Sequence, residues 1–160
     1  MIRILIADDH SVVRKGLRQI LSEGFPSVQI DEVGDANTMI KKVMDEEYDV
    51  VISDLSMPGR SGLEGLQQIK QINPKLPVLI LSIYPEEQYA IRLLKSGASG
   101  YLNKDLAPEE LVNAVQRVLL GKRYITPTIA EKLASSLDHP AEKDPHELLS
   151  DREFSVLKML

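Results

Sequence analysis

The stretch DVVISDLSMPG, residues 49–59, places an acidic side chain at the end of a run that is otherwise typical of a buried strand. The run 50–53 is almost continuously apolar, which is the pattern of a strand covered on both faces, as in a parallel sheet. Asp54 follows it directly, and the MPG sequence at 57–59 then indicates a turn that leads the chain away. The stretch therefore predicts a central strand with a carboxylate at its C-terminal end.

Strand-like runs alternate with segments of helical period over about the first 120 residues. This alternation is typical of βαβ units, in which helices cover both faces of a mostly parallel sheet. The predicted fold class is therefore α/β, with a doubly wound sheet of five parallel strands. The predicted strands are residues 3–7, 29–33, 50–53, 78–81 and 100–102, and the predicted helices are 12–22, 38–46, 63–72, 86–95 and 108–120, with Gly97 and Gly121 after the last two.

Length and composition restrict the class of protein. The 160 residues suffice for one dominant core and a modest appendage. No apolar run approaches the roughly 18 residues of a membrane helix, and the N-terminus lacks the features of a signal peptide. The absence of cysteine suits a reducing compartment, so we expect a cytoplasmic protein without membrane association. The net charge of -5 argues against strong nucleic-acid binding by this chain alone.

Polar side chains follow four of the predicted strands at their C-terminal ends. They are Asp8 and Asp9 after the first strand, Asp54 after the third, Ser82 after the fourth and Lys104 just beyond the fifth. Ligands of open parallel sheets bind at this edge, so we expect the five side chains to lie together. Three carboxylates in one pocket repel one another, by about 4 kcal/mol per pair at roughly 4 Å for an effective dielectric near 20. The pocket therefore needs positive charge.

A hard divalent cation, together with Lys104, would offset this repulsion. Oxygen ligands without a His or Cys cluster favour Mg²⁺, which is held by a few carboxylates and several waters. Next to such a cation, Asp54 could attack a phosphorus atom and form an aspartyl phosphate. Lys104 and Ser82 would then bind the phosphoryl oxygens. The residues therefore predict a phosphoacceptor site.

Other functions and ligands fit parts of the same pattern. His10 stands beside the acidic pair and could ligate a metal, although a single imidazole near a helix start is more often structural. Enzymes of the haloacid dehalogenase type also use an aspartyl phosphate, but they require DxD after the first strand, where this chain has adjacent acids. A flavodoxin-like flavin binder would share the sheet order, but a chain with no Trp and 4% aromatic residues offers little to stack on a flavin.

Four motifs occur in order along the chain: ADDH at residues 7–10, DLSMPGRSGLE at 54–64, LSIYPEEQYAIRLLKSGASGYLNKD at 81–105 and LSDREFSVLKML at 149–160. With them the chain resembles bacterial two-component response regulators of the NarL/FixJ subfamily, which join a receiver domain to a LuxR-type helix-turn-helix. The resemblance implies a CheY-like or flavodoxin-like sheet of order 2-1-3-4-5. It also implies a signalling domain, rather than an enzyme with a separate substrate, that a sensor histidine kinase phosphorylates on Asp54.

The resemblance also assigns the metal ligands. Asp9 is the implied direct ligand of Mg²⁺, and Asp8 is a ligand that acts directly or through water. Asp54 and the main-chain carbonyl of Ser56 complete the implied site.

The implied switch residues are Ser82, which supplies the switch hydroxyl, Lys104, which binds the phosphoryl group, and Tyr101, whose ring turns inward on phosphorylation. Three positions depart from the wider receiver pattern. They are Ile83, which is bulky where many receivers have a small residue, Asp105, which replaces a proline, and Ala107, which replaces a better helix N-cap.

The predicted domains are a receiver at residues 1–123, a helix and linker at 124–148, and the start of a truncated helix-turn-helix domain at 149–160. The segment 126–137 predicts a helix, and the charged, proline-containing segment 138–147 predicts a linker. Ser150 and Glu153 have capping-box spacing, which predicts a further helix start. Promoter DNA is therefore an expected partner of the full-length protein only, and homodimer formation stays open.

Overall fold

The structure is a computed structural model that describes residues 1–58, 61–83, 86–105, 108–126, 129–131 and 134–135. The chain divides into two compact units, Met1–Ile125 and Thr126–Leu160. In the second unit residues 129–131 and 134–135 are helical, and the N–H of Ala130 donates to the carbonyl oxygen of Thr126 at 2.9 Å. The segment 138–147 and the capping-box residues lie outside the described residues. None of the helices in the described ranges combines the length and apolarity that crossing a membrane requires.

The first unit contains a sheet of five strands. They are β1 (Ile2–Ala7), β2 (Val28–Val33), β3 (Val50–Asp54), β4 (Val78–Ser82) and β5 (Gly100–Asn103). The strand order is β2-β1-β3-β4-β5, and each of the four neighbouring pairs is parallel. This confirms the predicted fold class and order. Because the order reverses between β1 and β3, the C-terminal ends of these two strands flank the switch point of the sheet.

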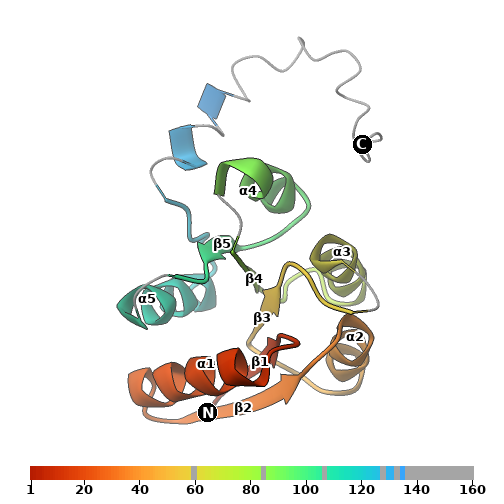
Figure 1. The fold of residues 1–160 in the computed structure, drawn as a ribbon, viewed down its shortest axis with the longest axis vertical. Coiled ribbons are helices and arrows are strands. Elements are labelled where there is room, and N and C mark those ends of the chain that lie inside the picture. The colour runs from red at the N-terminus through yellow and green to blue at the C-terminus, as the bar shows by residue number, and fades with distance from the viewer. Residues whose placement is uncertain (59–60, 84–85, 106–107, 127–128, 132–133, 136–160) are drawn as a thin grey trace. The chain divides into compact units, whose positions relative to one another are not determined.

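Five helices accompany the strands. They are α1 (Ser11–Gly24), α2 (Ala36–Asp45), α3 (Gly62–Ile72), α4 (Glu86–Lys95) and α5 (Pro108–Leu119). In Figure 1, α1 and α5 lie on one side of the sheet and α2 and α3 on the other. Helix α2 begins two residues before the predicted start, because the side chain of Asp35 caps it by accepting a hydrogen bond from the N–H of Thr38 at 2.7 Å.

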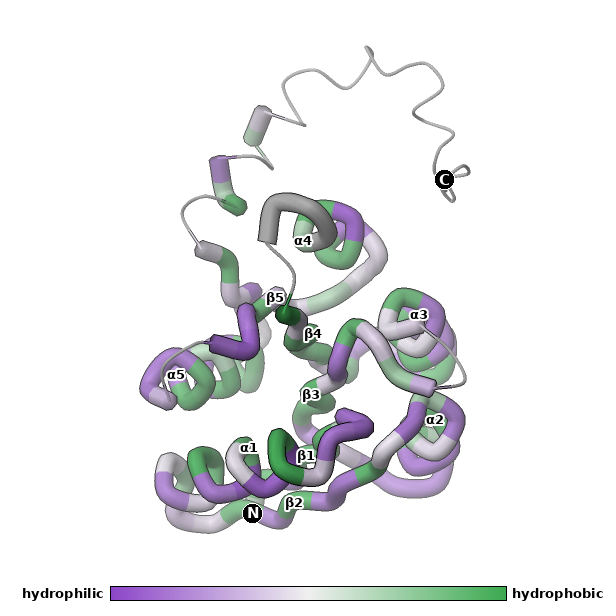
Figure 2. The backbone as a smooth tube through the Cα atoms, in the orientation of Figure 1, coloured by the Kyte–Doolittle hydropathy of each residue, from purple (hydrophilic) through white to green (hydrophobic). Residues whose placement is uncertain are grey.

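The central strands form the core. All residues of β3 and β4 are buried, and β1 is buried from Ile4 onwards. Figure 2 shows these strands as mostly hydrophobic segments inside the unit. Strands buried on both faces form a rigid support for the side chains at their ends.

The start of α3 lies very close to the end of β3. Ser61 and Glu64 form a capping box, and the N–H of Gly62 donates to the carbonyl oxygen of Leu55 at 2.6 Å. A methyl group on Gly62 would lie 2.6 Å from that oxygen and 2.9 Å from the carbonyl oxygen of Asp54. Only glycine permits this approach without displacing the backbone next to Asp54.

Replacing Gly62 with alanine is therefore expected to lower the free energy of unfolding by about 2 kcal/mol, because the added methyl group meets backbone atoms. Gly16→Ala is the matched control, since no atom lies within 4 Å of a methyl group at that site in α1. It should raise stability by about 0.5–1 kcal/mol through helix propensity. Urea unfolding of both variants measures the difference, and an equally stable Gly62→Ala protein would contradict the close approach.

The segment after α5 returns along β5. Gly121 has a positive φ of 83°, and the N–H of Tyr124 then donates to the carbonyl oxygen of Ser99 at 2.8 Å. Tyr124 forms a parallel bridge with Gly100, where a methyl group would lie 2.8 Å from the Leu79 side chain. The outer edge of β5 is therefore partly covered by the same chain.

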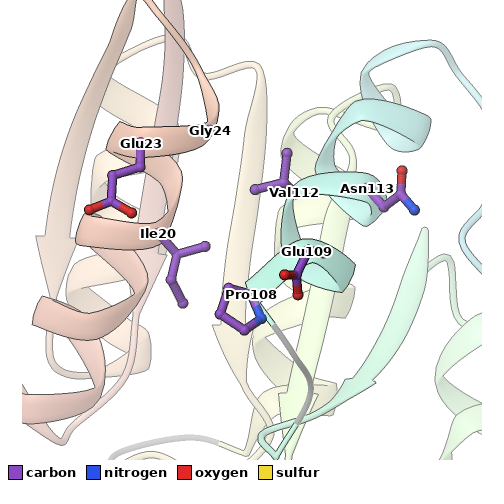
Figure 3. A pocket seen from close by; sticks show the side chains of 7 residues that line it. All are labelled: Ile20, Glu23, Gly24, Pro108, Glu109, Val112 and Asn113. Atoms are coloured by element: carbon purple, nitrogen blue, oxygen red, sulfur yellow. The ribbon is translucent and has the colours of Figure 1, made fainter.

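A shallow groove of about 380 Å³ lies between the end of α1 and the beginning of α5. Figure 3 shows Ile20 on α1 facing Pro108 and Val112 on α5 across this groove. None of the residues that line it belongs to the polar group at the strand ends.

Candidate functional site

The sheet brings the polar strand-end residues to one edge. Asp54 and Ser82 are the last residues of β3 and β4, one position later than the predicted strand ends. The N–H of Lys104, directly after β5, donates to the carbonyl oxygen of Ser82 at 2.9 Å. Asp8 follows β1, and its side chain, like those of Asp54 and Ser82, is buried. Asp8, Asp54 and Lys104 are in contact at this edge, and Ser82 ends the strand next to β3.

Lys104 joins two buried carboxylates. Its Nζ lies 2.9 Å from Oδ2 of Asp8 and 3.2 Å from Oδ2 of Asp54. The three side chains are 14%, 1% and 7% exposed, respectively. Burial alone would lower the pKa of Lys104, but the hydrogen bond to Asp8 and the charges of Asp54 and Asp8 raise it overall. Lys104 is therefore a cation at neutral pH.

The neighbouring groups do not fully offset the cost of a negative charge on the buried Asp54 carboxylate. Burial is the main cause that raises the pKa of Asp54, and the charge of Asp8 raises it further. Lys104 and the N–H of Ser56, which donates to Oδ1 of Asp54 at 3.3 Å, act in the opposite direction but leave the pKa raised. One ammonium group shared by two buried carboxylates leaves a net negative charge, which a divalent cation could neutralise.

The raised pKa predicts that Asp54→Asn stabilises the fold in the absence of divalent cations. An acid whose pKa is higher in the folded state contributes stability below its unfolded pKa and loses it as pH rises through the folded value. The gain in the free energy of unfolding from Asp54→Asn should therefore be small near pH 4 and larger at pH 7. Urea unfolding of both proteins in EDTA across this range measures it, and a variant less stable than the parent at pH 7 would contradict uncompensated charge at Asp54.

The turn after β1 adds ligand atoms to the cluster. Asp8, Asp9, His10 and Asp54 each offer one ligand atom, and these atoms lie within 4.8 Å of one another. Nδ1 of His10 lies 3.1 Å from Oδ1 of Asp8 and 3.0 Å from Oδ1 of Asp9. Three carboxylates at this spacing, two of them buried, fit a hard divalent cation.

The remaining predicted residues lie around this cluster. Ser56 is exposed in the loop after β3, where it pairs with Ser61 in an antiparallel bridge. Tyr101, within β5, is 2% exposed, so its ring is buried in this structure. Ile83 is 71% exposed directly after Ser82.

The turn that presents Lys104 is closed without proline. The side-chain oxygen of Asn103 accepts a hydrogen bond from the N–H of Asp105 at 2.8 Å. This Asx turn stabilises the bend in the chain, which a proline at position 105 would otherwise favour. Ala107 lies outside the described residues.

Arg14 on α1 is a site neighbour that the sequence pattern did not reveal. Its Nη1 donates to the main-chain carbonyl oxygen of Asp8, and its Nε donates to Oε1 of Glu32 at 3.2 Å. On a helix with arginines at positions 14 and 18, the ordinary interpretation is a solvated charged face. Only the sheet, which places Glu32 of β2 next to the β1 turn, reveals the contact.

Comparisons with known proteins place the chain in a family. Residues 4–116 match the model of the response regulator receiver domain. The chain is 35% identical to the response regulator GacA of Pseudomonas aeruginosa, over 100% of this chain and 75% of the relative. It is 37% identical to the oxygen regulatory protein NreC of Staphylococcus carnosus, over 99% of this chain and 76% of the relative.

A solved structure agrees with this assignment. The LuxR-family two-component response regulator from Aurantimonas sp. SI85-9A1 superposes with a TM-score of 0.76 at 32% identity, covering 86% of this chain and 98% of that one. The family match spans most of the α/β unit, and the similar proteins include a response regulator and a two-component response regulator of the LuxR family. The chain therefore belongs to the response regulators and contains their receiver domain.

Proposed function

We propose that this chain is a phosphorylation-controlled receiver whose phosphoacceptor is Asp54. The observation that carries the proposal is the buried carboxylate of Asp54 at the end of β3, held beside the acidic turn by the ammonium group of Lys104. A carboxylate in that position is a nucleophile on a rigid support, at the edge of the sheet where ligands of parallel sheets bind.

In the proposed reaction, an oxygen of Asp54 forms a bond to the phosphorus of the donor while the phosphorus–nitrogen bond to a kinase histidine breaks. Lys104 and the Ser82 hydroxyl donate hydrogen bonds to the phosphoryl oxygens. A bound Mg²⁺ would screen the negative charges of the phosphoryl group and the carboxylates. Asp8, Asp9, Asp54 and the carbonyl of Ser56 are the residues that would hold it.

The switch is proposed to use Ser82 and Tyr101. A phosphoryl group adds about -1.5 to -2 charges and three acceptor oxygens, which attract the Ser82 hydroxyl. The ring of Tyr101 is buried here, the arrangement that we assign to the phosphorylated form. Phosphorylation would then stabilise this arrangement over one with the ring outside.

The partners follow from the same proposal. A sensor histidine kinase supplies the phosphoryl group in the cytoplasm, and promoter DNA binds the full-length protein. We assign residues 1–123 to the receiver, 124–148 to a helix and linker, and 149–160 to the start of the helix-turn-helix. Sizing the protein with and without beryllofluoride, an acyl-phosphate mimic, tests whether phosphorylation changes its oligomeric state.

The test of the function is phosphorylation of the unmodified chain. Incubation with acetyl phosphate and Mg²⁺ should give one hydroxylamine-sensitive phosphoryl group, located at Asp54 by mass spectrometry, and EDTA should prevent it. Asp9→Asn should raise the Mg²⁺ concentration needed for half-maximal labelling. Labelling that is independent of divalent cations, or located at another residue, would overturn the proposal.

A further inference from the structure

We propose that Arg14 is a positioning residue for the divalent-cation pocket: it fixes the path of the Asp8–His10 turn and therefore the placement of the Asp8 and Asp9 carboxylates. The inference rests on the proposed function, because it concerns how that pocket is held ready for a cation. Arg14 itself touches no reacting atom.

The contact with the turn is direct. Nη1 of Arg14 donates to the carbonyl oxygen of Asp8, the residue whose side chain points to Lys104. The main-chain N–H of Asp8 donates to the carbonyl oxygen of Val33 at 3.1 Å. Both main-chain groups of Asp8 are therefore held, one by β2 and the other by the guanidinium. A shift of the carbonyl would rotate the peptide that joins the two acids.

The guanidinium is itself anchored. Its Nε donates a hydrogen bond to Oε1 of Glu32. The other carboxylate oxygen of Glu32 accepts a hydrogen bond from Nε of Arg18 at 2.5 Å. Arg18 also donates from Nη2 to the carbonyl oxygen of Ile30 at 2.9 Å. The hydrogen bond from Arg18 and, after it, that from Arg14 hold the pKa of Glu32 below its usual value. Glu32 is therefore a carboxylate with both oxygens engaged, on a strand that pairs with β1 along its length.

Gly34 lies beside the guanidinium, at a distance where a methyl group would make ordinary van der Waals contact. A methyl group at Gly34 would lie 3.5 Å from Nη1 of Arg14 and 4.0 Å from the carbonyl oxygen of Asp8. The Arg14 side chain is 21% exposed, so most of it lies inside this corner between α1, β1 and β2. Second-layer partners that orient metal ligands commonly change metal affinity by 10–100-fold when they are mutated.

The chain offers a matched control. Arg18 also pairs with Glu32 from α1, but it bonds Ile30 instead of Asp8. Arg14→Met and Arg18→Met each remove one arginine and one pair with Glu32. Only the first removes the bond to the turn. If the arginines merely attach α1 to β2, the two variants should behave alike.

The experiment measures Mg²⁺ binding without phosphorylation. The apparent Kd comes from the Mg²⁺ dependence of the unfolding temperature of the whole chain. Arg14→Met is expected to raise this Kd at least tenfold, and Arg18→Met less than threefold. Arg14→Lys should recover little, because one ammonium group cannot reproduce the two-ended contact of the guanidinium.

Labelling from acetyl phosphate provides a second readout. For Arg14→Met the Mg²⁺ concentration for half-maximal labelling should rise with the Kd, while the labelling rate at saturating Mg²⁺ stays within twofold of the parent.

If Arg14→Met fails to fold, Glu32→Gln replaces it and should raise the Kd for Mg²⁺ at least threefold relative to Arg18→Met. If Arg14→Met, or Glu32→Gln in its place, binds Mg²⁺ with the same Kd as Arg18→Met, the inference is overturned. A parent protein that neither binds Mg²⁺ nor becomes labelled would instead overturn the proposed function.

Discussion

Replacing Asp54 with asparagine is expected to abolish phosphoryl incorporation from acetyl phosphate. Asparagine has the shape of aspartate, so the end of β3 and its hydrogen bond from the N–H of Ser56 can be kept. The amide lacks the anionic oxygen that attacks phosphorus, and no acyl phosphate can form. The expected effect is complete loss of the hydroxylamine-sensitive group, observed as an unchanged intact mass.

Asp45→Asn is the control for this result. Asp45 is exposed at the end of α2, and the same substitution there removes one negative charge from the chain without touching the strand ends. It should be labelled at the rate of the parent. Asp54→Asn protein that still gains one phosphoryl group, at any residue, would mean that the nucleophile has been misassigned.

Replacing Lys104 with methionine is expected to destabilise the fold by about 3 kcal/mol at pH 7 without divalent cations. Methionine keeps the length and bulk of the side chain but leaves two buried carboxylates without their shared partner. Removing one partner of a buried ion pair commonly costs about 3–5 kcal/mol. Because the pKa of Lys104 is raised in the fold, its contribution is fully present at neutral pH and is lost only on strong alkalinisation.

Two comparisons distinguish this effect from a loss of packing. The double variant Lys104→Met with Asp54→Asn should recover at least half of the lost free energy of unfolding, because one of the two stranded charges is gone. Saturating Mg²⁺ should also restore stability to Lys104→Met. Lys122→Met, at an exposed lysine beyond α5, should change stability by less than about 0.5 kcal/mol. A double variant as unstable as Lys104→Met would exclude the electrostatic explanation.

The sheet was predictable because its strands are strongly patterned. The runs that became β1, β3 and β4 are almost continuously apolar, and such runs between helical segments leave few alternatives to a parallel sheet. The grouping of Asp8, Asp54 and Lys104 followed from this topology, since parallel strands bring their C-terminal ends to one edge. The roles of these residues in phosphorylation stay predictions that the experiments above address.

Contacts between main chain and distant side chains were not predictable. The bond from Arg14 to the carbonyl of Asp8 depends on how α1 crosses β2, and a sequence pattern does not specify that crossing. The start of α2 was misplaced for a simpler reason. Asp35 follows a glycine and looks like a loop residue, yet its carboxylate caps the helix. The approach of Gly62 to Leu55 was also invisible, because a glycine after a serine suggests a loop as readily as a helix start.

The bridge between Tyr124 and Gly100 determines where this receiver can be cut and joined to other domains. The family match ends at residue 116, but a fragment that stops there loses the chain that covers the β5 edge. Such a fragment would expose main-chain donors and acceptors that invite association with other strands. Exchange of output domains, in evolution or in protein engineering, is therefore best made after Ile125, so that the new fusion keeps the segment that partly covers this sheet edge.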